Sequence, residues 1–318
     1  MDVGAVTGHG GAGSERTPED GSAISATPPR AAVAGHGGSG VLLRALVDDA
    51  GLFPPTELGV ADAVRRHLAD RASGNAMLTH RFLCPLSRWE QLRAALPEDG
   101  TGGAVMLDAG VVVDTDAGLL GRVPDPDPRI RVTHYEVRVP AADIAAATRY
   151  LAEAGPDHAR TPVYLEVDRG PDGLDALAAL AGAAPLGAKV RCGGVRAELF
   201  PDVAELAAFI ATCARHAVPF KATAGLHHAV RHTDRATGFT HHGYLNLLLA
   251  TARAAQGGDR HAVAGALGAD DPASLVAEIR AISRPTAEHT RALLVAYGSC
   301  STSDPIADVD RLGLSGGG

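Results

Sequence analysis

Short apolar runs alternate with longer amphipathic stretches along most of the chain. Eight mostly apolar runs predict buried strands: Val41–Val47, Ala76–Leu83, Ala104–Leu107, Ile130–Val137, Pro162–Val167, Ala188–Arg191, Pro219–Thr223 and Ala292–Tyr297. Stretches with alanine and leucine at helical spacing predict helices: Gly59–Asp70, Ser87–Leu96, Ala141–Ala154, Gly173–Ala181, Val203–His216 and Asp304–Leu312. Apolar strands that alternate with helices predict a parallel sheet covered by helices.

The number and spacing of these units favour one α/β domain over residues 39–314, a (β/α)8 TIM barrel. A doubly wound open sheet is the alternative. However, no Gly-x-Gly-x-x-Gly turn follows the first strand, which weakens a dinucleotide-binding version of that fold. Residues 225–290 predict a long, largely helical insertion between the seventh and eighth strands. We expect this insertion to hang over the barrel mouth as a lid or to form an oligomer contact.

Composition narrows the functional classes. The chain has 318 residues, and 46% are hydrophobic, so a sizeable core can be buried. A net charge of −8 argues against a nucleic-acid partner, and no apolar run reaches the roughly 20 residues of a membrane span. Residues 1–38, rich in Gly, Ala, Ser, Thr and Pro, predict a disordered leader without a secretory signal. We therefore expect a cytoplasmic protein with four free cysteines, no cofactor and possible homo-oligomers.

Lysine is almost absent from the chain. Lys189 and Lys221 are the only two, whereas arginine appears 27 times. Arginine carries charge but cannot lose its proton to act as a nucleophile, whereas a lysine amine can once burial or a neighbouring cation lowers its pKa. Coding bias with two chance survivors is one interpretation. The other is that these two positions need an amine.

The two lysines fall on neighbouring predicted strands. Lys189 shares a strand face with Arg191, and Lys221 shares one with Thr223, because each pair is two residues apart. If these faces point into the barrel, the lysines lie roughly 5 Å apart. We then expect cationic repulsion to lower the pKa of one amine, as a Schiff-base lysine requires. The alternative is that each lysine pairs with a carboxylate such as Glu166 in a structural network.

Glycines and acids follow several strands. Gly193 and Gly194, Gly225, and the Gly298-Ser299-Cys300-Ser301 segment let backbone N–H groups approach an anion, and loops after the last two strands form the usual phosphate site of a barrel. Ordinary turn glycine is the alternative. Four acids are candidates for proton transfer or are simply solvated: Asp48, Asp49, Glu136 and Glu166.

Histidines cluster within sixteen residues: His227, His228, His232, His241 and His242. A metal site needs three or four converging ligands, and adjacent histidines point apart in a regular chain. We favour roles for His227 and His228 as acid/base or anion contacts and predict no metal ligand. Cys192 and Cys300 could join a metal site or fill small space, and no sequence signature marks a histidine as the base of a catalytic thiol.

The last three predicted strands resemble the deoxyribose-phosphate aldolase group of class I aldolases. The segments are Ala-Lys-Val-Arg-Cys-Gly-Gly around Lys189, Phe-Lys-Ala-Thr-Ala-Gly around Lys221, and Gly298–Ser301. The resemblance implies a barrel with an imine lysine at Lys189, a second lysine at Lys221 and a phosphate loop at Gly298–Ser301. Arg191 and the long insertion depart from the pattern of that group.

The chain also resembles a widespread set of uncharacterised bacterial barrel proteins over most of residues 41–313. The shared segments are AGLFPP (Ala50–Pro55), KATAGLHH (Lys221–His228), HG-x-LN (His242–Asn246) and GSCS (Gly298–Ser301). This likeness implies a shared fold and active site, including Asn246 among the substrate contacts, without naming a reaction.

Three hypotheses follow. The first is an aldolase-like lyase in which Lys189 forms an imine with a small phosphorylated or carboxylated carbonyl compound. Lys221 would lower its pKa, Glu166 or Asp49 would move protons, and Arg191 with the Gly298–Ser301 loop would hold the anion. The second is a metal-dependent hydrolase or isomerase that uses the histidines of residues 227–242. The third is a non-catalytic protein that binds an anionic metabolite.

Overall fold

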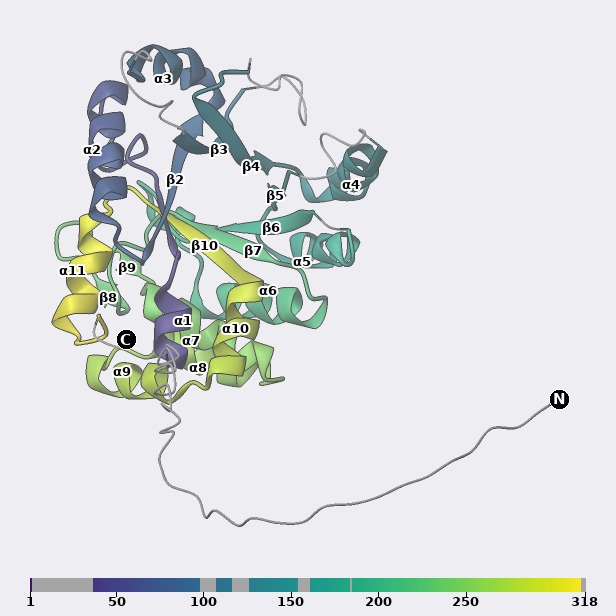
Figure 1. Ribbon diagram of the computed structural model, residues 1–318. Coiled ribbons are helices and arrows are strands. Elements are labelled where there is room, and N and C mark those ends of the chain that lie inside the picture. Colours follow the sequence, from purple (N-terminus) through teal and green to yellow (C-terminus); the bar gives the residue numbers. More distant parts are fainter. Residues whose placement is uncertain (2–36, 98–106, 116–125, 154–160, 184, 316–318) are drawn as a thin grey trace. The chain divides into compact units, whose positions relative to one another are not determined.

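Eight parallel strands close into a barrel in the computed structural model, which describes residues 1, 37–97, 107–115, 126–153, 161–183 and 185–315 (Figure 1). Their order around the barrel is β1-β10-β7-β6-β5-β4-β3-β2. The strands are β1 Val47–Asp49, β2 Leu78–Pro85, β3 Leu107–Val113, β4 Ile130–Arg138, β5 Val163–Glu166, β6 Leu186–Arg191, β7 Phe220–Thr223 and β10 Leu294–Ser299. The predicted (β/α)8 fold is thus confirmed.

Helices follow most strands and cover the outside of the barrel (Figure 1). They are α1 Gly38–Leu43, α2 Val60–Ser73, α3 Trp89–Ala95, α4 Ile144–Glu153, α5 Pro171–Leu177, α6 Val203–Arg215, α7 Tyr244–Ala255, α8 Arg260–Gly268, α9 Pro272–Ala281, α10 Arg284–Leu293 and α11 Ser303–Arg311. Single 310 turns are η1 Leu86–Arg88, η2 Ala141–Asp143, η3 Ala178–Leu180 and η4 Ala197–Leu199. Helix α6 begins with a capping box in which Asp202 and Glu205 each bind the other's backbone N–H, which fixes its start.

The strand register places the predicted site residues side by side. Glu166 of β5 pairs with Lys189 of β6, which pairs with Lys221 of β7. Side chains alternate between the two faces of a strand, so neighbours at one level of a parallel sheet face the same side. These three side chains accordingly face the barrel interior, whereas Val190, which directly follows Lys189 in β6, faces the helices.

The insertion after β7 has two parts. Residues 225–243 contain a small antiparallel hairpin, β8 His232–Thr233 and β9 Thr240–His241. Nδ1 of His241 lies 3.2 Å from the carbonyl oxygen of Gly225, which follows β7. Helices α7 to α10 pack instead against α1, α6 and one another. Helix α10 ends where β10 begins and packs against α1, the helix that precedes β1, and Figure 1 shows α7 to α10 grouped on that side of the barrel. The predicted lid is therefore wrong for the four helices, because their apolar faces are buried against the barrel's own helices.

The predicted first strand is also wrong over most of its length. Val41–Val47 overlaps helix α1, and the strand begins only at Val47. The reason is packing: α1 lies against α10 and α9, and a Cβ at Gly38 would lie 1.9 Å from the carbonyl oxygen of Ile282. Gly38, the last residue of the predicted leader, is thus the first residue of α1, and residues 2–36 of that leader lie outside the described part of the chain.

The third predicted strand began at Ala104. Residues 104–106 also lie outside the described part, and strand β3 begins at Leu107.

The composition also predicted free cysteines and no membrane-spanning segment. All four cysteines are free thiols, as predicted. In the described part of the chain, no helix combines the length and apolar character needed to cross a bilayer.

Candidate active site inside the barrel

The two lysines meet inside the barrel on either side of one carboxylate. Glu136 of β4 lies 2.8 Å from Nζ of Lys189 through Oε2 and 2.6 Å from Nζ of Lys221 through Oε1. All three side chains are at least nine-tenths buried. The convergence expected from the alternation of β6 and β7 is therefore present, but Glu136 separates the two ammonium groups.

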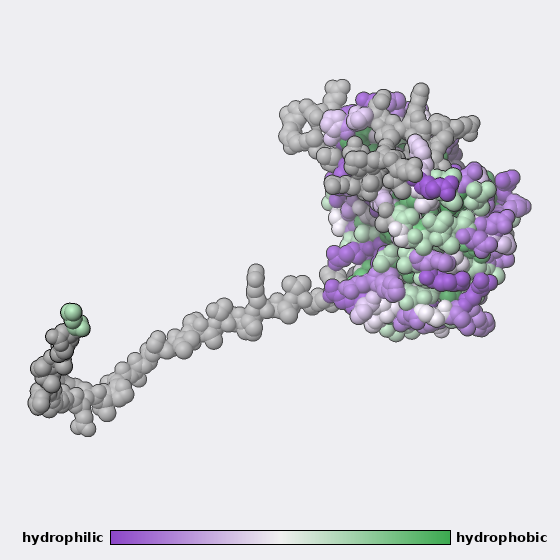
Figure 2. Space-filling view, turned by 90° about the vertical axis from the view of Figure 1, so that its right-hand side faces the viewer, coloured by the Kyte–Doolittle hydropathy of each residue, from purple (hydrophilic) through white to green (hydrophobic). Residues whose placement is uncertain are grey.

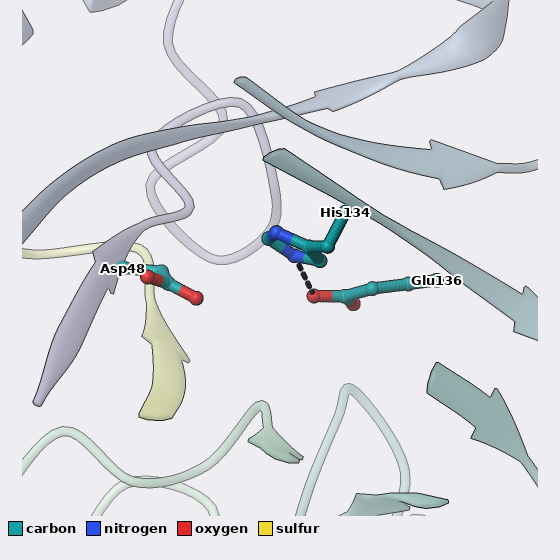
Figure 3. A group of neighbouring side chains, drawn as sticks. All are labelled: Asp48, His134 and Glu136. Carbon is teal, nitrogen blue, oxygen red and sulfur yellow. Dashed lines mark hydrogen bonds and ion pairs between the residues drawn. The ribbon is translucent and has the colours of Figure 1, made fainter. Parts of the chain in front are cut away.

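Lys221 lies in a cage of three acceptors. Oδ2 of Asp48, Nε2 of His134 and Oε1 of Glu136 each lie 2.6 Å from its Nζ (Figure 3 shows the three acceptor side chains). Burial, followed by the charge of Lys221, lowers the pKa of His134 to about 4, so the imidazole is neutral at pH 7. Nε2 then accepts from Lys221, and the proton on Nδ1 points to Oγ1 of Thr133, 3.1 Å away.

These contacts belong to a row of seven alternating charges, which we call the charge row. In order, it runs Arg191, Glu166, Lys189, Glu136, Lys221, Asp48 and Arg81. Successive charged atoms lie 3.2, 3.1, 2.8, 2.6, 2.6 and 2.8 Å apart. Thr79 adds a hydrogen bond of 2.6 Å to Asp48. The row holds four cations and three carboxylates, so it carries one surplus positive charge when all members are ionised.

The electrostatics of the row oppose the predicted loss of a lysine proton. Burial alone would lower the pKa of Lys189, but Glu136 and Glu166 outweigh it and the pKa is raised. Burial alone would raise the pKa of Glu136, yet Lys189 and Lys221 hold that pKa well below its ordinary value. The expectation that cationic repulsion lowers the pKa of Lys189 is wrong, because a carboxylate lies where the two cations would have faced each other. The alternative of lysines paired with carboxylates is what the structure contains.

A cavity of about 380 Å3 lies at the C-terminal ends of β5 and β6. Glu166, Lys189 and Arg191 are among its lining residues, whereas Lys221 is not. The other lining residues include apolar side chains of α5 and α6, such as Leu174 and Phe209, and charged side chains, such as Asp168 and Arg169. On the side of the molecule that carries α4 and α5, Figure 2 shows hydrophobic residues between bands of hydrophilic ones. The volume falls within the range of sites for small organic ligands.

Asp49, predicted as a catalytic acid, does not belong to this site. It faces α2, where its carboxylate pairs with Arg66 and lies 3.1 Å from Nδ1 of His67. Its neighbour Asp48 faces inward and is completely buried. Adjacent residues of a strand point to opposite faces, so only one of the two acids can reach the lysines.

The glycines predicted to bind an anion allow neighbouring loops to pack closely. Gly225 has φ of +72°, and a Cβ there would lie 2.8 Å from the carbonyl oxygen of Cys192. A Cβ at Gly193 would lie 2.7 Å from Cα of Gly225, and one at Gly194 would lie 2.4 Å from Cδ1 of Leu199. Close backbone packing is thus a sufficient reason for these glycines, and anion binding stays a prediction.

The serine hydroxyls at the end of β10 and in the loop that follows form hydrogen bonds with nearby backbone groups. The hydroxyl of Ser299 donates to the carbonyl oxygen of Ser301 at 2.6 Å, and the hydroxyl of Ser301 accepts from the backbone N–H of Asp304 at 3.2 Å. A Cβ at Gly298 would lie 3.0 Å from Cδ1 of Leu83. The predicted role of Gly298, Ser299 and Ser301 in holding a phosphate therefore stays a prediction.

The clustered histidines contact different polar groups, and some of them pack on one another. Nδ1 of His227 lies 3.6 Å from Sγ of Cys300, and Nδ1 of His228 lies 3.2 Å from Oδ2 of Asp308. His232 stacks on His241, and His242 contacts the carbonyl oxygen of Pro201, 2.8 Å away. Among the described residues, the group whose ligand atoms could together hold a metal is Asp48, His134 and Glu136, within 4.8 Å of one another. A metal there would compete with the ammonium of Lys221 for one position.

Asn246, predicted to contact substrate, has a structural role. Its side chain is completely buried in α7, donates to the carbonyl oxygens of Ala266 and Ala269, and accepts from the backbone N–H of Arg231. The amide therefore joins α7, the end of α8 and the loop after β7.

Four site residues were missed by sequence reasoning. Thr79 and Arg81 hold Asp48, His134 holds Lys221, and the ring of Tyr164 lies 5.6 Å from Nζ of Lys221. The spacing of two between His134 and Glu136 on a predicted strand was a usable signal, because it places both side chains on one face.

Comparison with known proteins adds no family. No protein-family model matches the chain, and a search of curated proteins found no match.

Proposed function

We propose that the protein is a Schiff-base lyase of the class I aldolase type, acting on a small carbonyl compound that carries a phosphate or carboxylate. The observation that carries the proposal is the meeting of the chain's two lysines on either side of Glu136. The barrel is a fold that enzymes commonly use, with active sites at the C-terminal strand ends, where the cavity beside Lys189 lies.

Lys189 is the proposed nucleophile because it lines the cavity. Lys221 is 1% exposed and is held by three acceptors, so it serves as a fixed charge that orients Glu136. Lys189 has two partners among the described residues, Glu136 and Glu166, which leaves the third N–H of its ammonium for a substrate oxygen.

The raised pKa of Lys189 sets the cost of the first step. Releasing its proton at pH 7 from an ordinary pKa of 10.5 already requires about 5 kcal/mol, and the carboxylates increase this cost. Glu166, 3.1 Å away, accepts the proton as the amine attacks the carbonyl carbon. A proton then moves from the nitrogen to the alkoxide oxygen, and Glu166 returns its proton to the resulting hydroxyl, which leaves as water. The nitrogen thereby becomes a positively charged iminium between the same carboxylates. The site thus favours the electron-poor iminium that promotes cleavage of the adjacent carbon–carbon bond.

Arg191 is the proposed anchor for the anionic group. Its side chain is 43% exposed at the cavity, and its Nε contacts Glu166 at 3.2 Å. The surplus positive charge of the charge row favours an anionic substrate over a neutral one. The loops at Gly193, Gly225 and Gly298–Ser301, together with His227 and His228, are the proposed surroundings of that anion.

Borohydride reduction tests the proposal. The protein is incubated with a panel of aldehydes, ketones and keto acids, reduced, digested and analysed by peptide mass spectrometry. We expect an adduct on Lys189, lost in Lys189→Arg, which keeps the charge, and retained in Lys221→Arg at a lower yield. Trapping should rise between pH 7 and 10 because the free amine becomes more abundant. No adduct on either lysine across the panel would refute the proposal.

A metal-dependent hydrolase or isomerase is a second candidate function. It is favoured by the convergence of Asp48, His134 and Glu136 rather than by the histidines of residues 227–242. Elemental analysis of the purified protein separates the two: a stoichiometric metal supports the second, and an active metal-free protein refutes it. A non-catalytic binder predicts that Lys189→Arg keeps function, whereas the imine proposal predicts its loss.

A further inference from the structure

Cys300 and His227 lie in contact at the barrel mouth, outside the charge row. Cys300 directly follows β10, His227 follows β7, and these two strands are neighbours in the barrel. Sγ of Cys300 lies 3.6 Å from Nδ1 of His227, within hydrogen-bond reach for sulfur. No step proposed for Lys189 uses the thiol.

The surroundings fix the thiol and leave the imidazole able to accept a proton. The carbonyl oxygen of Cys300 accepts a hydrogen bond of 2.9 Å from Arg66, which Asp49 anchors. Burial lowers the pKa of His227, and the opposing charge of Asp304 in the first turn of α11 does not reverse this. His227 is thus neutral at pH 7, and its Nδ1 can take the proton of the thiol.

The other cysteines are more deeply buried than Cys300. Cys84, Cys192 and Cys213 are completely buried, whereas Cys300 is 5% exposed. Burial raises the pKa of Cys84 and of Cys192 to about 12 and that of Cys213 still further. A hydrogen-bonded base beside a nucleophile is the arrangement that activates a thiol, and among the cysteines Cys300 has it.

We infer that Cys300 and His227 form a second reactive site, a thiol–imidazole pair that adds reversibly to aldehydes. His227 takes the thiol proton, the sulfur electron pair forms a bond to the carbonyl carbon, and the carbonyl π pair moves to oxygen. The imidazolium then returns the proton to that oxygen, which gives a hemithioacetal. This addition needs no leaving group, oxidant or further reactant. It needs one group that carries the proton, and His227 is that group.

Alkylation with iodoacetamide tests the thiol. Peptide mass spectrometry follows each cysteine in the intact folded protein, so the three buried cysteines are internal controls. At pH 7.5 we expect Cys300 to react about tenfold faster or more than the others, and His227→Asn to remove most of this excess. His241→Asn is the matched control, because His241 lies beside His227 but does not contact the thiol. His227→Gln replaces His227→Asn if thermal melting shows that Asn disturbs the fold.

Protection by glycolaldehyde tests the substrate class. The aldehyde should slow alkylation of Cys300 reversibly in the wild type and equally in Lys189→Met, which cannot form an imine. Two results would overturn the inference: reactivity of Cys300 no greater than that of Cys84, or an equal loss in His227→Asn and His241→Asn. Protection that is absent, or that disappears in Lys189→Met, would overturn the aldehyde assignment. The proposal for Lys189 stands or fails separately in borohydride trapping.

Discussion

Replacing Glu136 with Gln tests the central contact of the charge row. The substitution keeps the shape of the side chain but removes the negative charge between Lys189 and Lys221. At an effective dielectric constant of about 20, each contact, at 2.8 and 2.6 Å, corresponds to about 6 kcal/mol of attraction. Burial of each ion costs several kcal/mol, so we expect a net loss of about 3–5 kcal/mol in the free energy of unfolding at pH 7.

The assay is denaturant unfolding with thermal melting, in which this loss corresponds to a fall of about 6–20 °C in the melting temperature. The control is Glu90→Gln, because Glu90 is 71% exposed and its pair with Arg93 should contribute about 1 kcal/mol or less. Equal losses in the two variants would refute the reasoning, as would a Glu136→Gln variant more stable than the wild type.

The loss should depend on pH with a definite sign. The pKa of Lys189 is raised in the folded protein, so its stabilisation is complete below the unfolded pKa of about 10.4 and declines as the pH rises through the folded value. The folded pKa of Glu136 is depressed, so its stabilisation is present above about pH 4.3 and declines as the pH falls. The difference between wild type and Glu136→Gln should therefore be nearly constant between about pH 4.3 and 10.4 and smaller at both extremes; a difference that falls within this range would contradict the reasoning.

Three further predictions concern single positions. Lys221→Ala should bind Zn2+ or Mn2+ more tightly than the wild type in calorimetry, because the three acceptor groups around the missing ammonium lie within 4.8 Å of one another; unchanged affinity would count against a metal-sized cage. Asn246→Ala should lose about 3 kcal/mol of unfolding free energy, since three buried hydrogen bonds disappear, and a loss below about 1 kcal/mol would contradict its structural role. Gly225→Ala should cost at least about 1 kcal/mol more than Gly74→Ala, because both glycines have positive φ but a Cβ meets other atoms only at Gly225; equal costs would show that the loops can separate.

The barrel and the meeting of the lysines were predictable because both depend on local periodicity. Most strands were identified as apolar runs that alternate along the chain with stretches of helical periodicity. Within β6 and β7, side chains alternate between the two strand faces, and this alternation places Lys189 and Lys221 on the inner face. The choice between Asp48 and Asp49 was not predictable, since a strand of three residues has no alternating pattern to set its phase. Helix α1 was mistaken for strand because a short apolar run has the same appearance in either.

The direction of the pKa change at Lys189 depends on contacts across the barrel, which the local sequence pattern does not reveal. Glu136 follows Asp48 by 88 positions and lies three strands away from Lys221 around the barrel, yet both acids touch that amine. Periodicity tells which face a side chain occupies but not which side chains meet across the barrel axis. The prediction therefore placed the two amines correctly and missed the carboxylate between them.

The charge row also makes the energetics of the barrel interior collective. Each inner member has a neighbour of opposite sign on both sides, so a substitution at one position changes the field felt by the next, and effects of paired substitutions are not additive. We expect an anion that drew Arg191 away from Glu166 to strengthen the contact of Glu166 with Lys189 and to weaken that of Lys189 with Glu136. By the same alternation, binding of an anion at Arg191 would change the electrostatic field at Arg81 of β2, the other end of the charge row.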